Sequence, residues 1–173
     1  MKLHVPFLAL SLLFITGINA QDIPSADQVL AEGSKVAAKE KKNVMIIFHA
    51  SWCGWCKKMD KAMNEPEMKP LFEKNYVIRH LTVYESPGKE KLENPGALDL
   101  LKKYKGADMG IPYFLVFSPD GKMLADSQIK PGENVGCPAD DNEVEFFTAA
   151  LKKTSRLSDS QLKEIGERFK KNK

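Results

Sequence analysis

The sequence predicts an α/β sandwich in which helices flank a central mixed sheet of about four or five strands. The first observation is that apolar runs of strand length alternate with segments of helical period, in the order helix, strand, helix, strand, helix, strand, strand, helix. The second is that a helix separates the first two strands, which favours parallel pairing through a right-handed crossover. The third is that a tight turn separates the last two strands, which indicates an antiparallel hairpin.

Length and composition are those of one globular domain. The chain has 173 residues, of which 43% are hydrophobic and 28% are charged. Its 26 basic and 23 acidic side chains leave a net charge of +3 and are scattered along the sequence. Since only the lysine-rich end is densely basic, we expect no nucleic-acid partner.

The first 20 residues predict a signal peptide. Lys2 and His4 precede an apolar run from Val5 to Ile18, and Ala20 offers a small residue at the cut. The run is shorter than the roughly 20 residues of a membrane-spanning helix, so cleavage after Ala20 is favoured over an uncleaved anchor. We therefore expect an exported protein, periplasmic or secreted, whose mature domain covers residues 21–173.

The first helix of the mature chain is an amphipathic packing helix. Ser25 and Gln28 have the spacing of a capping box, and the helix should end near the lysine-rich segment 39–42. One face of it carries the residues that we expect to pack: Ala26, Val29, Leu30, Gly33, Val36 and Ala37.

A buried strand then leads into a pair of cysteines. The run Val44–Phe48 is continuously apolar, as in a strand covered on both faces, and 50–52 is short enough to be a turn. Cys53 should fall on the first turn of the next helix, where free N–H groups and the macrodipole favour a thiolate. Cys56 follows one turn further in. We expect an exposed, nucleophilic sulfur at Cys53 and a sheltered, resolving sulfur at Cys56.

The spacing of this pair favours chemistry over stapling. Exported proteins use disulfides to join segments that are distant in sequence, whereas a pair at C-x-x-C spacing restrains little chain entropy. Cys53 and Cys56 are therefore interpreted as a redox-active dithiol.

The middle of the chain continues the alternation of helix and strand. Pro66 should occupy the first position of a short helix that runs through Lys74. Residues 76–84 are expected to form a strand, and the polar segment 86–95 a surface loop.

A capped helix and a hairpin should follow. Asn94 and Pro95 are expected to cap a helix that stops at Gly106. The turn sequence 118–121 separates two strands, Tyr113–Phe117 and Lys122–Ser127.

The remainder should be a loop and two helices. Residues 130–141 are rich in turn formers, and capping boxes open helices at Asp140 and at Ser158. The core is expected over about residues 26–155, with a helical extension over about 158–171.

Two segments resemble a known family. The residues Ala50 to Met59, which contain Trp-Cys-Gly-Trp-Cys, and the residues Gly110-Ile111-Pro112 resemble thioredoxin-like thiol-disulfide oxidoreductases, in particular the exported thioredoxin-related proteins. The resemblance covers roughly Val44 to Ser127. It implies a thioredoxin-like fold with an added C-terminal helix.

The resemblance also implies a mechanism and a substrate site. Cys53 would attack a substrate disulfide and Cys56 would release the product. A cis bond between Ile111 and Pro112 would face the dithiol and let the Ile111 backbone pair with an extended substrate, the alternative being an ordinary trans proline that starts a strand.

The residues around the cysteines should set recognition and direction. Trp52 and Trp55 are expected to form an apolar lip that contacts substrate, rather than core. Gly54 and Trp55 replace the Gly-Pro of cytosolic thioredoxins and should influence the redox potential.

One position departs from the family pattern. Ile47 stands where thioredoxins carry a buried aspartate, so any base for Cys56 would be His49, His80 or a water, although structural roles are favoured for both histidines. Lys57 and Lys58 could lower the pKa of Cys53 or could be ordinary solvated lysines.

The third cysteine, Cys137, is the odd one. We expect it to be unpaired and non-catalytic, the alternatives being an intermolecular disulfide or a regulatory thiol.

The favoured function is the reduction of disulfides in exported proteins, with a membrane or soluble thiol-disulfide partner as electron source and no cofactor. The alternatives are an oxidase or isomerase with the same dithiol, a copper-binding or metallochaperone module, and a non-catalytic interaction domain. No zinc site is predicted, because four ligands are needed and no second C-x-x-C or H-x-x-x-H is present.

Overall fold

A computed structural model describes residues 23–173, so the predicted signal peptide and its cleavage after Ala20 lie outside the described residues. Within this range, no helix combines the length and the apolar character that crossing a bilayer requires. The elements in chain order are α1 (Ala26–Glu40), β1 (Asn43–His49), α2 (Gly54–Met63), α3 (Lys69–Glu73), β2 (Tyr76–Thr82), η1 (Glu90–Leu92), α4 (Ala97–Lys103), β3 (Tyr113–Phe117), β4 (Met123–Asp126), β5 (Gln128–Lys130), β6 (Glu133–Asn134), α5 (Asp141–Thr154), α6 (Asp159–Phe169) and η2 (Lys170–Asn172).

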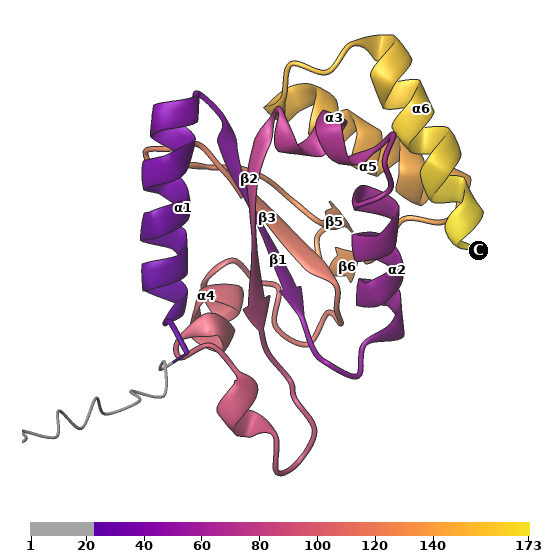
Figure 1. The fold of residues 1–173 in the computed structure, drawn as a ribbon. Helices are drawn as coiled ribbons and strands as arrows, with labels where there is room; N and C mark the ends of the chain where they lie inside the picture. The colour runs from indigo at the N-terminus through magenta and orange to yellow at the C-terminus, as the bar shows by residue number, and fades with distance from the viewer. Residues whose placement is uncertain (1–22) are drawn as a thin grey trace, which may run out of the picture.

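The central sheet has four strands in the order β2-β1-β3-β4 (Figure 1). β1 pairs with β2 in parallel, across the crossover that contains α2 and α3. β1 pairs with β3, and β3 with β4, in antiparallel fashion. The predicted mixed sheet, with its parallel first pair and its closing hairpin, is confirmed.

Alternation along β1 builds two cores, one on each face of the sheet. Val44, Ile46 and Phe48 pack against α1 and α4, whereas Met45 and Ile47 pack against α2, α3, α5 and α6. Figure 1 shows α1 and α2 on opposite sides of the sheet. All five of these side chains are at most 1% exposed, and each stabilises the fold by about 1.5–3 kcal/mol.

Helix α6 completes the core on the α2 side. Phe169 is fully buried, and its ring centroid lies 4.9 Å from that of Phe147 and 6.3 Å from that of Phe72. The predicted C-terminal helix is therefore part of the packed domain and covers its core.

Three helices begin as the sequence predicts. Capping boxes join Ser25 to Gln28, Asp140 to Glu143 and Ser158 to Gln161. In each box the two side chains bind each other's backbone N–H groups, which have no partner within the helix.

Two predicted helix starts are wrong. Helix α3 begins at Lys69 and carries Pro70, not Pro66, in its first turn. Helix α4 is capped by Gly96, which has a φ of 79°, and not by Asn94. The Asn94 side chain instead accepts a hydrogen bond from the N–H of Thr82 at 2.7 Å, so it is not free to cap a helix.

The predicted loop 130–141 contains part of a small hairpin. β5 and β6 pair in antiparallel fashion around Gly132, whose φ of 85° suits a residue without a Cβ. Strands of three and two residues are too short to show a hydrophobic period, which explains why the sequence did not reveal them.

Candidate active site

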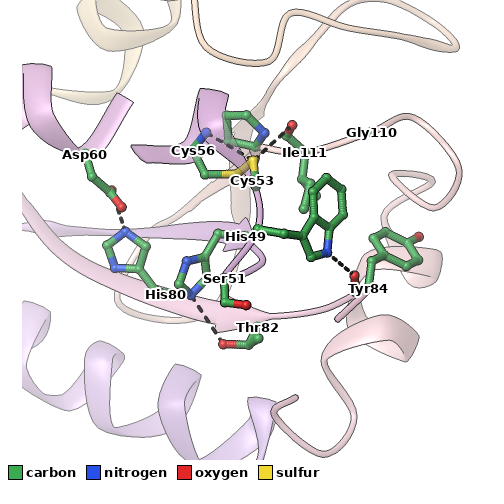
Figure 2. Close-up of a disulfide and its surroundings, with 12 residues drawn as sticks. His49, Ser51, Cys53, Cys56, Asp60, His80, Thr82, Tyr84, Gly110 and Ile111 are labelled. Atoms are coloured by element: carbon green, nitrogen blue, oxygen red, sulfur yellow. Dashed lines mark hydrogen bonds and ion pairs between the residues drawn. A yellow bond between two sulfur atoms is a disulfide. The ribbon is translucent and has the colours of Figure 1, made fainter. Parts of the chain in front are cut away.

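Cys53 and Cys56 form a disulfide at the start of α2 (Figure 2). Their Cα atoms are 5.3 Å apart. Cys53 is the N-cap, one position before the first turn in which it was predicted, and Cys56 is the third residue of the helix. The backbone N–H of Cys56 points at the Cys53 sulfur, 3.1 Å away. After reduction, this N–H and the positive end of the helix would favour a thiolate on Cys53.

The predicted difference in exposure between the two cysteines is wrong. Cys53 is 3% exposed and Cys56 is 2% exposed. Both pack with Ala50, and the partly buried Ile111 lies against them. In the oxidised protein, therefore, position along the helix distinguishes the two sulfurs, and access to solvent does not.

The segment that carries Pro112 lies against the disulfide, as the resemblance implied. The bond between Ile111 and Pro112 is cis. The Ile111 carbonyl oxygen is 3.6 Å from the Cys53 sulfur, and Figure 2 shows the two residues side by side. The chain thus brings two sites 58 residues apart in sequence into contact.

The two tryptophans lie at the surface around the buried disulfide. Trp52 is 55% exposed and Trp55 is 48% exposed, so neither belongs to the core. The Trp52 Nε1–H donates a hydrogen bond to the Tyr84 carbonyl at 2.7 Å. The Lys58 ammonium lies 4.1 Å from the centroid of the Trp55 ring, in the geometry of a cation–π contact. Each indole is therefore held in position at the surface by a contact with a neighbouring residue.

Gly54 lies between these tryptophans and is exposed. Apart from its two chain neighbours and the backbone of its own helix, a Cβ at this position would meet no atom of residues 23–173 within 4 Å. No packing contact in that range requires a glycine here.

A carboxylate clamps the turn before the dithiol. Glu85, which is only 9% exposed, accepts hydrogen bonds from the Ser51 N–H at 2.6 Å and from the Ser51 hydroxyl at 2.7 Å. The bond from the Ser51 N–H is the main reason that the pKa of Glu85 lies below its usual value. The sequence gives no signal for this residue, because the two partners are 34 positions apart and no local pattern links them.

A groove of about 300 Å³ opens beside the disulfide. Trp55, Ile111 and Pro112 line one wall, and the segment Val135–Cys137 with Ala139 lines the other. Asn134 links the segment 110–112 to Gly136: its amide donates to the carbonyls of Gly110 and Pro112 at 3.1 and 2.9 Å, and its oxygen accepts from the Gly136 N–H at 3.0 Å.

Cys137 is a free, buried thiol in the wall of this groove. Burial raises the pKa of Cys137 to about 11, so the thiol form dominates at neutral pH. Cys137 is unpaired, as predicted, and this environment favours the non-catalytic role that the sequence predicts for it.

The position of the family's aspartate is apolar. Ile47 is 1% exposed within β1. On the α2 side, His80 binds Asp60 at 2.8 Å, and His49 lies 3.3 Å from the Thr82 hydroxyl (Figure 2). Burial, followed by the neighbouring His80, holds the pKa of His49 below its usual value. Both imidazoles are bonded within the fold, in keeping with the structural roles predicted for them.

The described part of the chain offers no cluster of metal ligands that would support the metal-binding alternative. Across residues 23–173, no three or more His, Cys, Asp or Glu side chains gather in a way that could hold a metal ion. The two sulfurs would be the whole ligand set that this site offers to copper(I).

Comparison with known proteins gives one match to a family and one to a curated relative. A family described as thioredoxin-like matches residues 25–119, which is more than half of the chain. A protein disulfide-isomerase of Hordeum vulgare is 30% identical over 90 residues. This stretch is 52% of the present chain but only 15% of that relative.

Similar solved structures include a disulphide isomerase from Xylella fastidiosa Temecula1, with 21% identity, a TM-score of 0.46, and coverage of 84% of this chain and 86% of that one. Another is titled DsbH oxidoreductase, with 23% identity, a TM-score of 0.45, and coverage of 83% and 94%. The family match agrees with the four-stranded sheet, the Cys53–Cys56 pair at the start of α2 and the cis proline beside it. The chain belongs to the thioredoxin-like family.

Proposed function

We propose that the protein is a thiol-disulfide oxidoreductase that reduces disulfides in exported proteins through Cys53 and Cys56. The observation that carries this proposal is the position of the disulfide, with the Cys53 sulfur at the N-terminus of α2, 3.1 Å from a backbone N–H. A sulfur held there gains stability as a thiolate, which is the attacking species in disulfide exchange.

The reaction takes two displacements at sulfur. The Cys53 thiolate attacks one sulfur of the substrate disulfide, forms a mixed disulfide and releases the other substrate sulfur as a thiolate. The Cys56 thiolate then attacks the Cys53 sulfur and expels the second substrate thiolate. The substrate has gained two electrons, and the protein is left with the Cys53–Cys56 disulfide. A membrane or soluble dithiol partner returns the two electrons and closes the cycle.

The surface around the disulfide would bind the substrate. The exposed rings of Trp52 and Trp55 offer apolar contact area without demanding a particular sequence. The Ile111 backbone beside Cys53 would pair with an extended substrate strand, with Pro112 holding that segment in place. Gly54 lies between the two tryptophans in sequence and adds no side chain to this surface.

Export is a further part of the proposal and depends on the signal peptide predicted over residues 1–20. The mature protein would be the single domain 21–173, with its core over about 26–155. N-terminal sequencing of the exported protein tests this, with Gln21 as the expected first residue.

Two measurements test the reaction and its direction. The first is turnover of a protein disulfide such as that of insulin. Cys53→Ser should abolish turnover, whereas the matched control Cys137→Ser should retain it. Full activity in Cys53→Ser would remove the basis of the proposal.

The second measurement is the reduction potential of the dithiol in a glutathione or dithiothreitol buffer. A potential of about −270 mV, as in reducing thioredoxins, supports the reduction of substrate disulfides. A potential of about −120 mV would indicate instead that the protein oxidises substrate thiols. Stoichiometric copper(I) binding in a protein without exchange activity would favour the metallochaperone alternative.

A further inference from the structure

The two walls of the groove beside the disulfide belong to segments that are distant in sequence. Trp55 lies on α2, and Cys137 lies in the loop between β6 and α5. Because the groove lies between them, its width depends on whatever fixes these two segments relative to each other. Asn172, in the η2 turn after α6, contacts both.

The side chain of Asn172 reaches the wall that contains Cys137. Its Nδ2 is 3.4 Å from the Cys137 sulfur and 3.4 Å from the Pro138 carbonyl oxygen. Asn172 is only 5% exposed, so these contacts are shielded from water.

The backbone of Asn172 reaches the wall that contains Trp55. Its carbonyl oxygen accepts a hydrogen bond from the Lys58 ammonium at 2.9 Å. The same ammonium lies 4.1 Å from the centroid of the Trp55 ring. Because its ammonium group is held by the Asn172 carbonyl, Lys58 limits the positions that the Trp55 ring can adopt.

Asn172 is itself held from α6. Arg168 donates to the Asn172 side-chain oxygen at 2.9 Å, and the same guanidinium binds Glu65 through two contacts. The buried Phe169 anchors this turn in the core. Figure 1 shows α6 leading to the side of the domain where α2 lies. Asn172 is thus a fixed point between the two walls.

We propose that Asn172 is a positioning residue that sets the spacing of the groove walls and thereby determines how tightly a protein substrate is held. This inference rests on the proposed function, since it assumes that the groove receives the chain that flanks the substrate disulfide. Asn172 takes no part in the exchange at sulfur. Its removal should weaken the binding of large substrates and leave small disulfides unaffected.

The test compares two substrates across four variants. Turnover is measured with insulin and with the small disulfide DTNB for Asn172→Ala, for Lys58→Met and for the matched controls Lys171→Ala and Lys61→Met, which change exposed lysines of η2 and α2. Asn172→Ala removes the side-chain contacts to Cys137, Pro138 and Arg168 and keeps the carbonyl that binds Lys58, whereas Lys58→Met removes that bond. Each of these two variants should raise the KM for insulin about fivefold, which is the effect of about one net hydrogen bond on binding. For Asn172→Ala the kcat, the turnover of DTNB and the reduction potential should stay unchanged, as should all values for the controls.

A second readout does not depend on activity. The chain has three cysteines and two form the disulfide, so Cys137 is the single thiol that iodoacetamide can modify in the oxidised protein. Asn172→Ala should raise its alkylation rate about fivefold because the shielding side chain is gone. A thermal melt shows that each variant is folded.

The outcomes separate the inference from the proposed function. A wild-type protein that reduces neither substrate refutes the proposed function. The alkylation rate of Cys137 in Asn172→Ala then still tests whether the Asn172 side chain shields that wall of the groove. An active wild type whose insulin KM is unchanged in both Asn172→Ala and Lys58→Met overturns the inference alone. An equal loss of turnover with insulin and DTNB also overturns it, because it assigns Asn172 to general stability.

Discussion

Asn134→Ala should loosen the segment that faces the dithiol. The Asn134 side chain makes three hydrogen bonds, two to the carbonyls of Gly110 and Pro112 and one from the Gly136 N–H. A net hydrogen bond stabilises a protein by about 0.5–1.5 kcal/mol, and partial exposure places these three in the lower half of that range. We therefore expect Asn134→Ala to lower the free energy of unfolding by about 2 kcal/mol.

The assay is urea denaturation of the oxidised protein, followed by far-UV circular dichroism. In a thermal melt followed by the same signal, the midpoint should fall by about 4–8 °C for a domain of this size. Because the two carbonyls that Asn134 holds, those of Gly110 and Pro112, flank Ile111, the KM for insulin should also rise.

Asn134→Asp is the matched variant. It keeps the oxygen that accepts from Gly136 but sets a second oxygen against two carbonyls, so it should destabilise the fold at least as much as alanine does. If Asn134→Ala and Asn134→Asp both unfold within about 0.5 kcal/mol of the wild type, these hydrogen bonds do not hold the loop.

Three further substitutions test the packing of the core and the charged groups near the dithiol. Gly106→Ala should destabilise the fold by about 2 kcal/mol in urea denaturation, because its Cβ would lie 2.5 Å from a methyl of Leu101; an unchanged midpoint would show that the neighbours can move aside. Glu85→Gln should destabilise the protein at pH 7, and its difference from the wild type should shrink as the pH falls below about 4.5, because the carboxyl pKa is lowered by folding and the ionised form stabilises the turn only above that range. A pH-independent difference would count against that clamp. The pKa of His49 is also lowered by folding, so the unfolded state takes up the proton first and stability falls as the pH drops below about 6.5; His49→Gln should reduce this fall, and an identical pH profile would contradict the assignment.

The parts of the fold that the sequence predicts depend on contacts within a few residues. The box between Ser25 and Gln28 spans three positions, and the apolar run of β1 is visible in the sequence alone. The turn after Phe117 has local chemistry of the same kind. The resemblance added the cis bond before Pro112, which no local pattern would have predicted.

The parts that the sequence missed depend on contacts between distant residues. Asn94 has the sequence features of a helix cap, but in the fold its side-chain oxygen accepts the hydrogen bond of the Thr82 N–H at the end of β2. Glu85 and Asn172 reach partners 34 and 114 positions away. The burial of Cys53 depends on Ile111, which precedes β3 and packs against it because the start of β3 pairs with the end of β1. Such contacts exist only once the sheet has formed.

The most direct test of the central claim is the identity of the sulfur that bonds to substrate. Cys56→Ser, mixed with a disulfide-containing protein and quenched with acid, should yield a stable mixed disulfide, because the second displacement is blocked. Peptide mass spectrometry should map this bond to Cys53. A mixed disulfide at Cys137 instead, or none at all, would contradict the account.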